Sequence, residues 1–264
     1  MSGPAELAYE QAVEVLPWAR VVLERNPGPM ALEGTNTWLL GHEDVVVIDP
    51  GEDDEAHLRA VLEAVTSDGG RVAQVVVTHG HHDHSGGARR FHELSGAPVR
   101  ALDPQHRFGG EGLVEGDVVH ADGVALQVAL TPGHTADSIC LMTPDAVLTG
   151  DTVLGRGTTV VAWPDGDLAD YLASLHRLAD LGDRTVLPGH GPVLGSAGAV
   201  VREYLAHREQ RLEQVRAVLA DVGTDGDVDA LVETVVERVY ADVDRAVWFA
   251  ARMSVRAQVE YLLR

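Results

Sequence analysis

The stretch Thr78-His79-Gly80-His81-His82-Asp83-His84 is the feature around which this chain of 264 residues is organised. Five of its seven residues carry side chains that can bind a metal ion. The apolar run 72–77 precedes it and Ser85-Gly86-Gly87 follows, which predicts a strand, a tight turn and the start of a helix. Because these groups would be costly to bury unpaired, the stretch favours a metal site over a solvated His-rich loop.

Four further segments repeat the order of apolar strand, turn and ligand-type residue. They end at Asp49, His134, Asp151 and His190. If the strands lie side by side, these side chains gather along one loop-bearing edge of the sheets. Metal and substrate sites are often found at such edges.

We expect seven metal ligands, divided into two sites with one bridge. The first is a three-nitrogen site with an open position, typical of catalytic zinc, and is formed by His79, His81 and His134. The second has mixed nitrogen and oxygen ligands and is formed by Asp83, His84 and His190, with Asp151 as the bridge. Imidazoles with carboxylates suit two Zn ions per chain best, with Fe or Mn as alternatives.

Such a site indicates a hydrolase. Two cations about 3.5–4 Å apart can share a water and lower its pKa, and the bridging hydroxide then attacks an electron-poor centre. Asp83 is the candidate catalytic residue, because it can orient this nucleophile or carry its proton. A structural zinc site would instead be a closed cage of four ligands, so a non-enzymatic binding module with a structural metal is a weaker alternative.

Composition limits the class of protein. With 45% hydrophobic residues, the chain can bury one large core and a small appendage. The segment 1–14 lacks the basic start of a signal peptide, Cys140 is the single cysteine, and no apolar run approaches the roughly 20 residues of a membrane span. We therefore expect a cytoplasmic protein with no membrane partner.

The net charge of the chain indicates which kinds of binding partner it favours. The formal net charge is −21, and all 20 basic residues are Arg, which is typical of translation from a GC-rich bacterial genome. An acidic surface repels nucleic acid unless a local basic patch outweighs it. A small-molecule substrate is therefore favoured over single-stranded RNA, and either a monomer or a homodimer is expected.

Periodicity and turn residues predict an α/β (α+β) chain. Strands are expected at 17–25, 35–41, 44–49, 72–77, 98–101, 117–120, 124–130, 138–142, 146–148 and 184–187. Helices are expected at 55–66, 87–95, 167–181, 197–221, 228–240 and 246–263. A domain boundary is expected near residue 195, which separates a metal domain (1–195) from a helical C-terminal domain (196–264).

The ligand motifs resemble those of the metallo-β-lactamase-fold hydrolases. The likeness covers the first 195 residues and all five motifs, here Asp49, the 79–84 loop, His134, Asp151 and His190. It implies a four-layer αβ/βα sandwich with a dinuclear site at its upper edge. It also implies that Asp49 supports the ligands from behind and does not bind metal itself.

Within this superfamily the chain is most similar to the β-lactamase-like endoribonuclease and thioesterase branch. The likeness rests on 34–40, 150–159, 171–175, 188–193, the Tyr204-xx-His207-Arg208 pattern and a tail that resembles a small winged-helix-like domain. Two departures weaken the likeness to the ribonuclease members. Ser138 stands where they tend to have His, and the chain stops at Arg264, before the β wing of the family.

The main hypothesis is a dinuclear zinc hydrolase of an ester, thioester or lactone-type small substrate. The alternative is a metal-dependent endoribonuclease on single-stranded RNA, and glyoxalase II-like or low-level β-lactamase activity is weaker. Candidates for the substrate mouth are Asn36, Arg156 and Thr158, for which a role in loop structure is equally expected. His82 should point away from the metals, and seven other histidines are expected at the surface or on helices: His42, His57, His92, His106, His120, His176 and His207.

Overall fold

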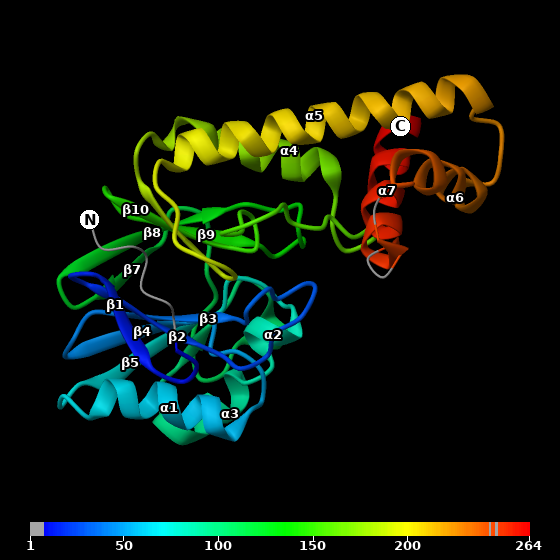
Figure 1. Cartoon of the computed structure of the whole chain (residues 1–264). Helices are drawn as coiled ribbons and strands as arrows, with labels where there is room; N and C mark the ends of the chain where they lie inside the picture. Colours follow the sequence, from blue (N-terminus) through cyan, green and yellow to red (C-terminus); the bar gives the residue numbers. More distant parts are fainter. Residues whose placement is uncertain (1–7, 243, 246–247) are drawn as a thin grey trace.

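The computed structural model describes residues 8–242, 244–245 and 248–264. Two mixed β-sheets lie face to face, with helices on both outer faces (Figure 1). The first sheet has the order β1 (Ala12–Leu16), β2 (Ala19–Leu23), β3 (Asn36–Leu40), β4 (Asp44–Ile48), β5 (Arg71–Val76) and β6 (Val99–Arg100). The second has the order β11 (Thr185–Pro188), β10 (Ala146–Gly150), β9 (Ile139–Met142), β8 (Val124–Leu130) and β7 (Val118–Ala121).

The two faces of the first sheet are both covered, which explains its near-continuous apolar strands. Along β4, Val46 and Ile48 face the core between the sheets, while Val45 and Val47 face helices α1 (Glu55–Thr66) and α3 (Ala88–Ser95). On the second sheet, α4 (Leu168–Leu178) and α5 (Ala197–Val222) form the opposite outer layer (Figure 1). The expected four-layer sandwich is therefore confirmed.

Strand direction places the ligand-bearing turns at one edge. The β4–β5 and β10–β11 pairs are both parallel, so the carboxyl ends of each pair lie together. The two sheets are joined at this edge by backbone hydrogen bonds, from Asn36 N to Gly189 O (2.8 Å) and from Ile139 N to Thr78 O (3.0 Å). The turns after β4, β5, β10 and β11 therefore converge on one region of the molecule.

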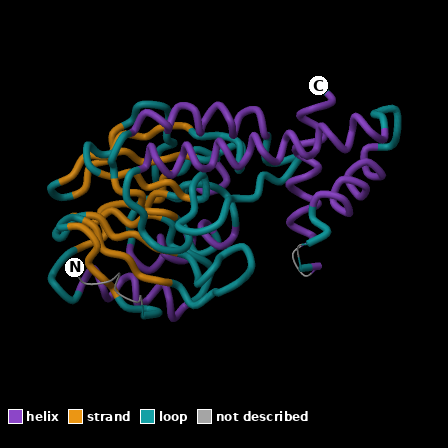
Figure 2. The backbone as a smooth tube through the Cα atoms, turned by 45° about the horizontal axis from the view of Figure 1, so that its top comes forward, coloured by secondary structure: helices purple, strands orange, loops and turns teal. Residues whose placement is uncertain are grey.

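The C-terminal part is helical. The 26-residue helix α5 extends beyond the sandwich and carries α6 (Val228–Val239) and α7 (Trp248–Leu263) (Figures 1 and 2). A small apolar cluster that includes Val215, Val235 and Val255 holds these three helices together. In the described residues no strand follows β11, and none of the described helices has the length and apolar character needed to span a membrane.

The N-terminal hairpin and one short helix differ from expectation. A single strand was expected at 17–25, but β1 and β2 form a hairpin that turns between Leu16 and Ala19. The β1 strand lies at the sheet edge and is only partly buried, so its sequence lacks the apolar run that marks the inner strands. The metal-binding stretch also contains a helical turn, α2 (His82–Ser85), where a plain turn was expected.

Candidate metal centre

The 78–84 stretch leaves β5 and enters α2. His81 precedes α2 in an extended conformation (φ −61°, ψ 144°) at the N-cap position, which aims its ring back toward His79. Within the helical turn, His84 is fully buried while His82 is exposed. The local geometry thus separates the three inward histidines of this stretch from the outward one.

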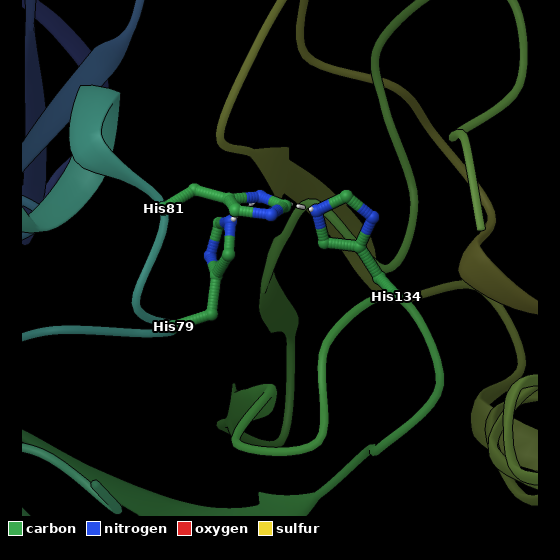
Figure 3. Close-up of side chains that lie close together, drawn as sticks. All are labelled: His79, His81 and His134. Carbon is green, nitrogen blue, oxygen red and sulfur yellow. Dashed lines mark hydrogen bonds between the residues drawn. The ribbon is translucent and has the colours of Figure 1, made fainter. Parts of the chain in front are cut away.

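The first group of ligand atoms comprises three imidazole nitrogens (Figure 3). His81 Nδ1 lies 3.1 Å from His79 Nε2 and 3.0 Å from His134 Nε2. Ligand nitrogens around a tetrahedral zinc ion with bonds of about 2.0–2.1 Å would stand about 3.3–3.4 Å apart. A small adjustment would therefore let all three nitrogens reach one cation.

The second group contains two imidazoles and a carboxylate. His84 Nε2 and His190 Nε2 are 3.1 Å apart, and Asp83 Oδ2 lies 3.2 Å from His190 Nε2. Asp151 lies between the groups: its Oδ1 is 3.4 Å from His84 Nε2, and its Oδ2 is 3.7 Å from His134 Nε2. Asp151 Oδ1 is buried and has no hydrogen-bond partner among the described residues, as expected of an atom that a cation would satisfy.

The protonation states suit cation binding. Burial lowers the pKa of His79 and His134, and neighbouring positive charge lowers it further, so both rings are held neutral with a lone pair to offer. Burial opposes ionisation of Asp83 and Asp151. However, the hydrogen bond from His190 and the charges of His190 and His84 outweigh it, lowering the pKa of Asp83 to about 2 and that of Asp151 well below its usual range. His84 and His190 differ: burial opposes their charge, but Asp151 and the other neighbouring carboxylates raise the pKa of His84 well above its usual range and that of His190 to about 9. These two rings carry a proton that a divalent cation would displace, and imidazoles with ionised carboxylates form a donor set that fits such ions.

Hydrogen bonds behind the rings orient three ligands. The Nδ1 atoms of His84, His134 and His190 donate to Asp49 Oδ2 (2.9 Å), Val160 O (2.8 Å) and Gly34 O (3.1 Å), respectively. Each contact places a proton on Nδ1 and turns Nε2 toward the centre, where it is the nitrogen that a cation would bind. Such supporting contacts fix the tautomer and strengthen metal binding.

Asp49, which orients His84, is itself positioned by hydrogen bonds. It accepts hydrogen bonds from Thr78 N and Thr78 Oγ1, both at 2.7 Å, in addition to the bond from His84. Its φ of 52° lies in the left-handed region, which Asp and Asn tolerate better than other residues with a side chain. Thr78 was not singled out from the sequence, although it directly precedes His79.

We expect Asp49→Asn to lower metal affinity by about 10–100-fold, because His84 loses its charged acceptor while the backbone conformation is preserved. Competition with a fluorescent zinc chelator would measure the change. The matched control is Asp44→Asn, which changes an exposed aspartate at the start of β4, the strand that Asp49 follows. Equal metal affinity in the Asp49→Asn and Asp44→Asn variants would refute the supporting role.

The structure brings all seven expected ligands into this region. Of the candidate substrate residues, Asn36 and Arg156 line one pocket together, and Thr158 lines another. Asn36 is buried, and its Nδ2 donates to Pro188 O (3.1 Å) and Gly191 O (2.9 Å), so it ties together the loop that carries His190. Arg156 pairs with Glu33 at the surface. Thr158 lines a separate pocket beside α5.

Among the histidines expected at the surface or on helices, His57 lies on α1. It is completely buried, and its Nε2 and Nδ1 atoms contact Thr37 Oγ1 (2.9 Å) and Glu10 Oε2 (2.7 Å), respectively. The polar partners come from β3 and from the turn before β1, both distant in sequence, so the local helical pattern could not reveal them. His207 also has a buried Nδ1 atom without a hydrogen-bond partner among the described residues.

The fold and these two ligand groups define a metal-dependent hydrolase. The chain belongs to the metallo-beta-lactamase superfamily, whose sequence model matches residues 31–190. It is 35% identical over 254 residues to the "Beta-lactamase-like protein 2 homolog" of Caenorhabditis elegans, covering 92% of this chain and 83% of that protein. It is also 35% identical over 240 residues to the "Atrochrysone carboxyl ACP thioesterase" of Aspergillus fumigatus, covering 84% of this chain and 74% of that protein.

The fold extends over nearly the whole chain in a solved structure. A beta-lactamase domain protein from Burkholderia ambifaria superimposes with a TM-score of 0.81 and 25% sequence identity. The superposition covers 98% of this chain and 89% of that one. The helical C-terminal part is therefore included in the shared fold.

Proposed function

We propose that the enzyme is a dinuclear zinc hydrolase that cleaves an ester, thioester or lactone-type small substrate, with a thioester as the best candidate. The observation that carries this proposal is the pair of ligand groups with Asp151 between them. The choice of a thioester is supported by the relative named as an acyl carrier protein thioesterase.

The proposed ligands are His79, His81 and His134 for one ion, Asp83, His84 and His190 for the other, and Asp151 for both. When bound, the two ions would supply a water of lowered pKa and polarise the acyl carbonyl. Asp83 is 25% exposed at its side chain, whereas Asp151 is 10% exposed, so Asp83 is the carboxylate that faces incoming water. We assign it to orient the nucleophile and to carry its proton to the leaving group.

The environment of Ser138 argues against RNA cleavage as the main activity of this enzyme. Its side chain is buried and contacts Thr135 Oγ1 at 2.7 Å, which braces the turn that carries His134. Ser138 therefore has a structural role here, and it lacks the imidazole that a His at this position could use for proton transfer. Cleavage of single-stranded RNA remains the alternative activity, on the resemblance to the endoribonuclease branch.

Metal analysis tests the centre directly. The purified protein should hold close to two metal ions per chain by inductively coupled plasma mass spectrometry, with zinc predominant. Dialysis against a chelator should abolish hydrolysis and lower the melting temperature, because the clustered carboxylates and imidazoles lose the cations that hold them together. Zinc should restore both properties, and a fully active metal-free protein would contradict the proposal.

A substrate panel tests the reaction. The panel contains an acyl-glutathione, a lactone, a nitrocephin-type β-lactam, bis-p-nitrophenyl phosphate and an unstructured RNA. We expect the thioester to give the highest kcat/KM with the metal-loaded enzyme. If RNA alone were cleaved, the nuclease alternative would replace the proposed function.

A further inference from the structure

A pocket of 260 Å³ lies on the far side of the segment that supports His134. The loop 158–160 forms one wall, and residues of α5, α7 and the end of α6 form the others. Its polar lining comprises Thr158, Thr159, His207, Arg208, Arg211, Tyr240 and Ser254. None of the residues that line it is acidic, although the chain as a whole carries a net charge of −21.

Arg208 is the central feature of this pocket. It is only 4% exposed, and its guanidinium lies over the ring of Tyr171 at 5.1 Å. One terminal nitrogen donates to Thr159 O, but Nε is buried and has no partner among the described residues. A buried cation with an unused donor is costly unless a counter-ion binds.

Two neighbours of Arg208, one charged and one neutral, also lack an acidic partner among the described residues. Arg211 lies over the ring of Tyr240 at 4.8 Å and bonds Gln214, and no carboxylate among the described residues pairs with it. His207 Nδ1 is buried without a partner in the described part of the chain. By contrast, the arginines nearby on the same helices are ion-paired to carboxylates: Arg216, Arg238, Arg252 and Arg256.

The donor set is that of an oxyanion site. Guanidinium groups bind phosphate and carboxylate through several charge-assisted hydrogen bonds, and the threonine hydroxyls can add further donors. Burial and the two arginine charges lower the pKa of His207, and a bound anion would offset that effect of the charges. The chemistry thus points to a phosphate or a carboxylate.

The pocket is coupled in space to the metal centre. Arg208 donates to Thr159 O, while Thr159 Oγ1 lies 3.3 Å from His134 Nδ1 and the next carbonyl, Val160 O, accepts from the same nitrogen at 2.8 Å. One short segment therefore separates the anion pocket from a proposed metal ligand. A long leaving group could place its reacting sulfur at the centre and its anionic end in the pocket.

We propose that the pocket formed by His207, Arg208 and Arg211 binds an anionic group, phosphate or carboxylate, on the thiol leaving group of the substrate. This inference rests on the proposed thioester hydrolysis. In that reaction, water supplies the oxygen of the new C–O bond, the C–S bond breaks, and the thiol leaves with a proton. Binding of the anionic end would position the thioester and select substrates that carry it.

The test compares Arg211→Gln with Arg216→Gln. Both changes remove one positive charge from α5, but Arg216 is exposed and paired with Glu213 outside the pocket. Three thioesters serve as substrates: S-acetyl phosphopantetheine with a phosphate, S-acetyl glutathione with carboxylates, and S-acetyl pantetheine with neither. Arg211→Gln should raise KM about tenfold or more for the anionic substrate that fits. The same variant should change the KM for S-acetyl pantetheine less than twofold. Arg211→Lys, which keeps the charge, should have a KM for the anionic substrate between those of Arg211→Gln and the parent enzyme.

The two anionic substrates identify the source of the anion, since only the matching one should respond to Arg211→Gln. Equal KM values in the Arg211→Gln and Arg216→Gln enzymes for both anionic thioesters would overturn the anion pocket and leave the proposed hydrolysis intact. If the metal-loaded enzyme cleaves none of the three thioesters, the proposed function fails instead. Calorimetric titration with phosphopantetheine and with glutathione then tests the anion pocket. Weaker binding in Arg211→Gln but not in Arg216→Gln supports the pocket, and equal binding in the two variants overturns it.

Discussion

Asp151→Ala should reduce kcat/KM for the best substrate by about 10³-fold or more while leaving the fold intact. Removing the proposed bridge deprives both ions of a shared ligand, and metal stabilisation of developing charge is worth several kcal/mol, each 1.36 kcal/mol of which is about tenfold in rate. Two features favour survival of the fold. The Asp151 side chain is 10% exposed at the edge of the sheets, and its Oδ1 forms no hydrogen bond among the described residues.

The control for this variant is Asp180→Ala. This change removes an exposed carboxylate from the short helix 179–181 that follows α4, in the outer helical layer. Steady-state kinetics, metal content and thermal unfolding should be measured on both proteins. Asp180→Ala should match the parent enzyme in all three. Full turnover by Asp151→Ala on every substrate in the panel would show that the bridging role is wrong.

Gly133→Ala should destabilise the protein by about 3 kcal/mol or more, because strain and a backbone clash add together. Gly133 has φ 132°, and an added Cβ would lie 2.2 Å from Tyr171 Cα and 2.3 Å from Tyr171 N. Neither side can easily yield: Asp167 N donates to Gly133 O (3.0 Å), and Ser174 Oγ donates to Pro132 O (2.7 Å). The turn that carries His134 is thereby fixed against the first turns of α4.

Gly69→Ala isolates the clash from the strain. Gly69 has φ 83°, but its added Cβ would meet no atom within 4 Å. This variant should lose only about 1–2 kcal/mol through its unfavourable backbone conformation. Urea unfolding measures both changes, and an equal loss in the two variants would refute close packing of Gly133 against α4.

Much of the fold could be read from local patterns. Helix α1 has the expected bounds, 55–66, because apolar spacing defines its buried face and Asp54 caps its start through bonds to Ala56 N and His57 N. The inner strands were recognisable because both of their faces are buried. The edge strand β1 was missed because an edge position demands no such apolar run.

The site residues also fall into those that local sequence patterns could predict and those that they could not. The four proposed ligands of 78–84, which are His79, His81, Asp83 and His84, are neighbours in sequence, and the strand–turn–ligand order pointed to the other members. The unpaired cations beside α5 could not be found, because Arg208 looks like any arginine of an amphipathic helix until its neighbours are known. That no acidic residue is among those that line the pocket follows from how the described elements pack together.

The sequence by itself determined the order and type of most elements and the chemical identity of the clustered ligands, since side-chain periodicity and turn residues act over a few positions. Only the tertiary structure decided the distances among His134, Asp151 and His190, the burial of His57 and the pocket around Arg208. Those features depend on how two sheets join at one edge and how helices pack on their outer faces. Packing of this kind is set by contacts between residues far apart in the chain.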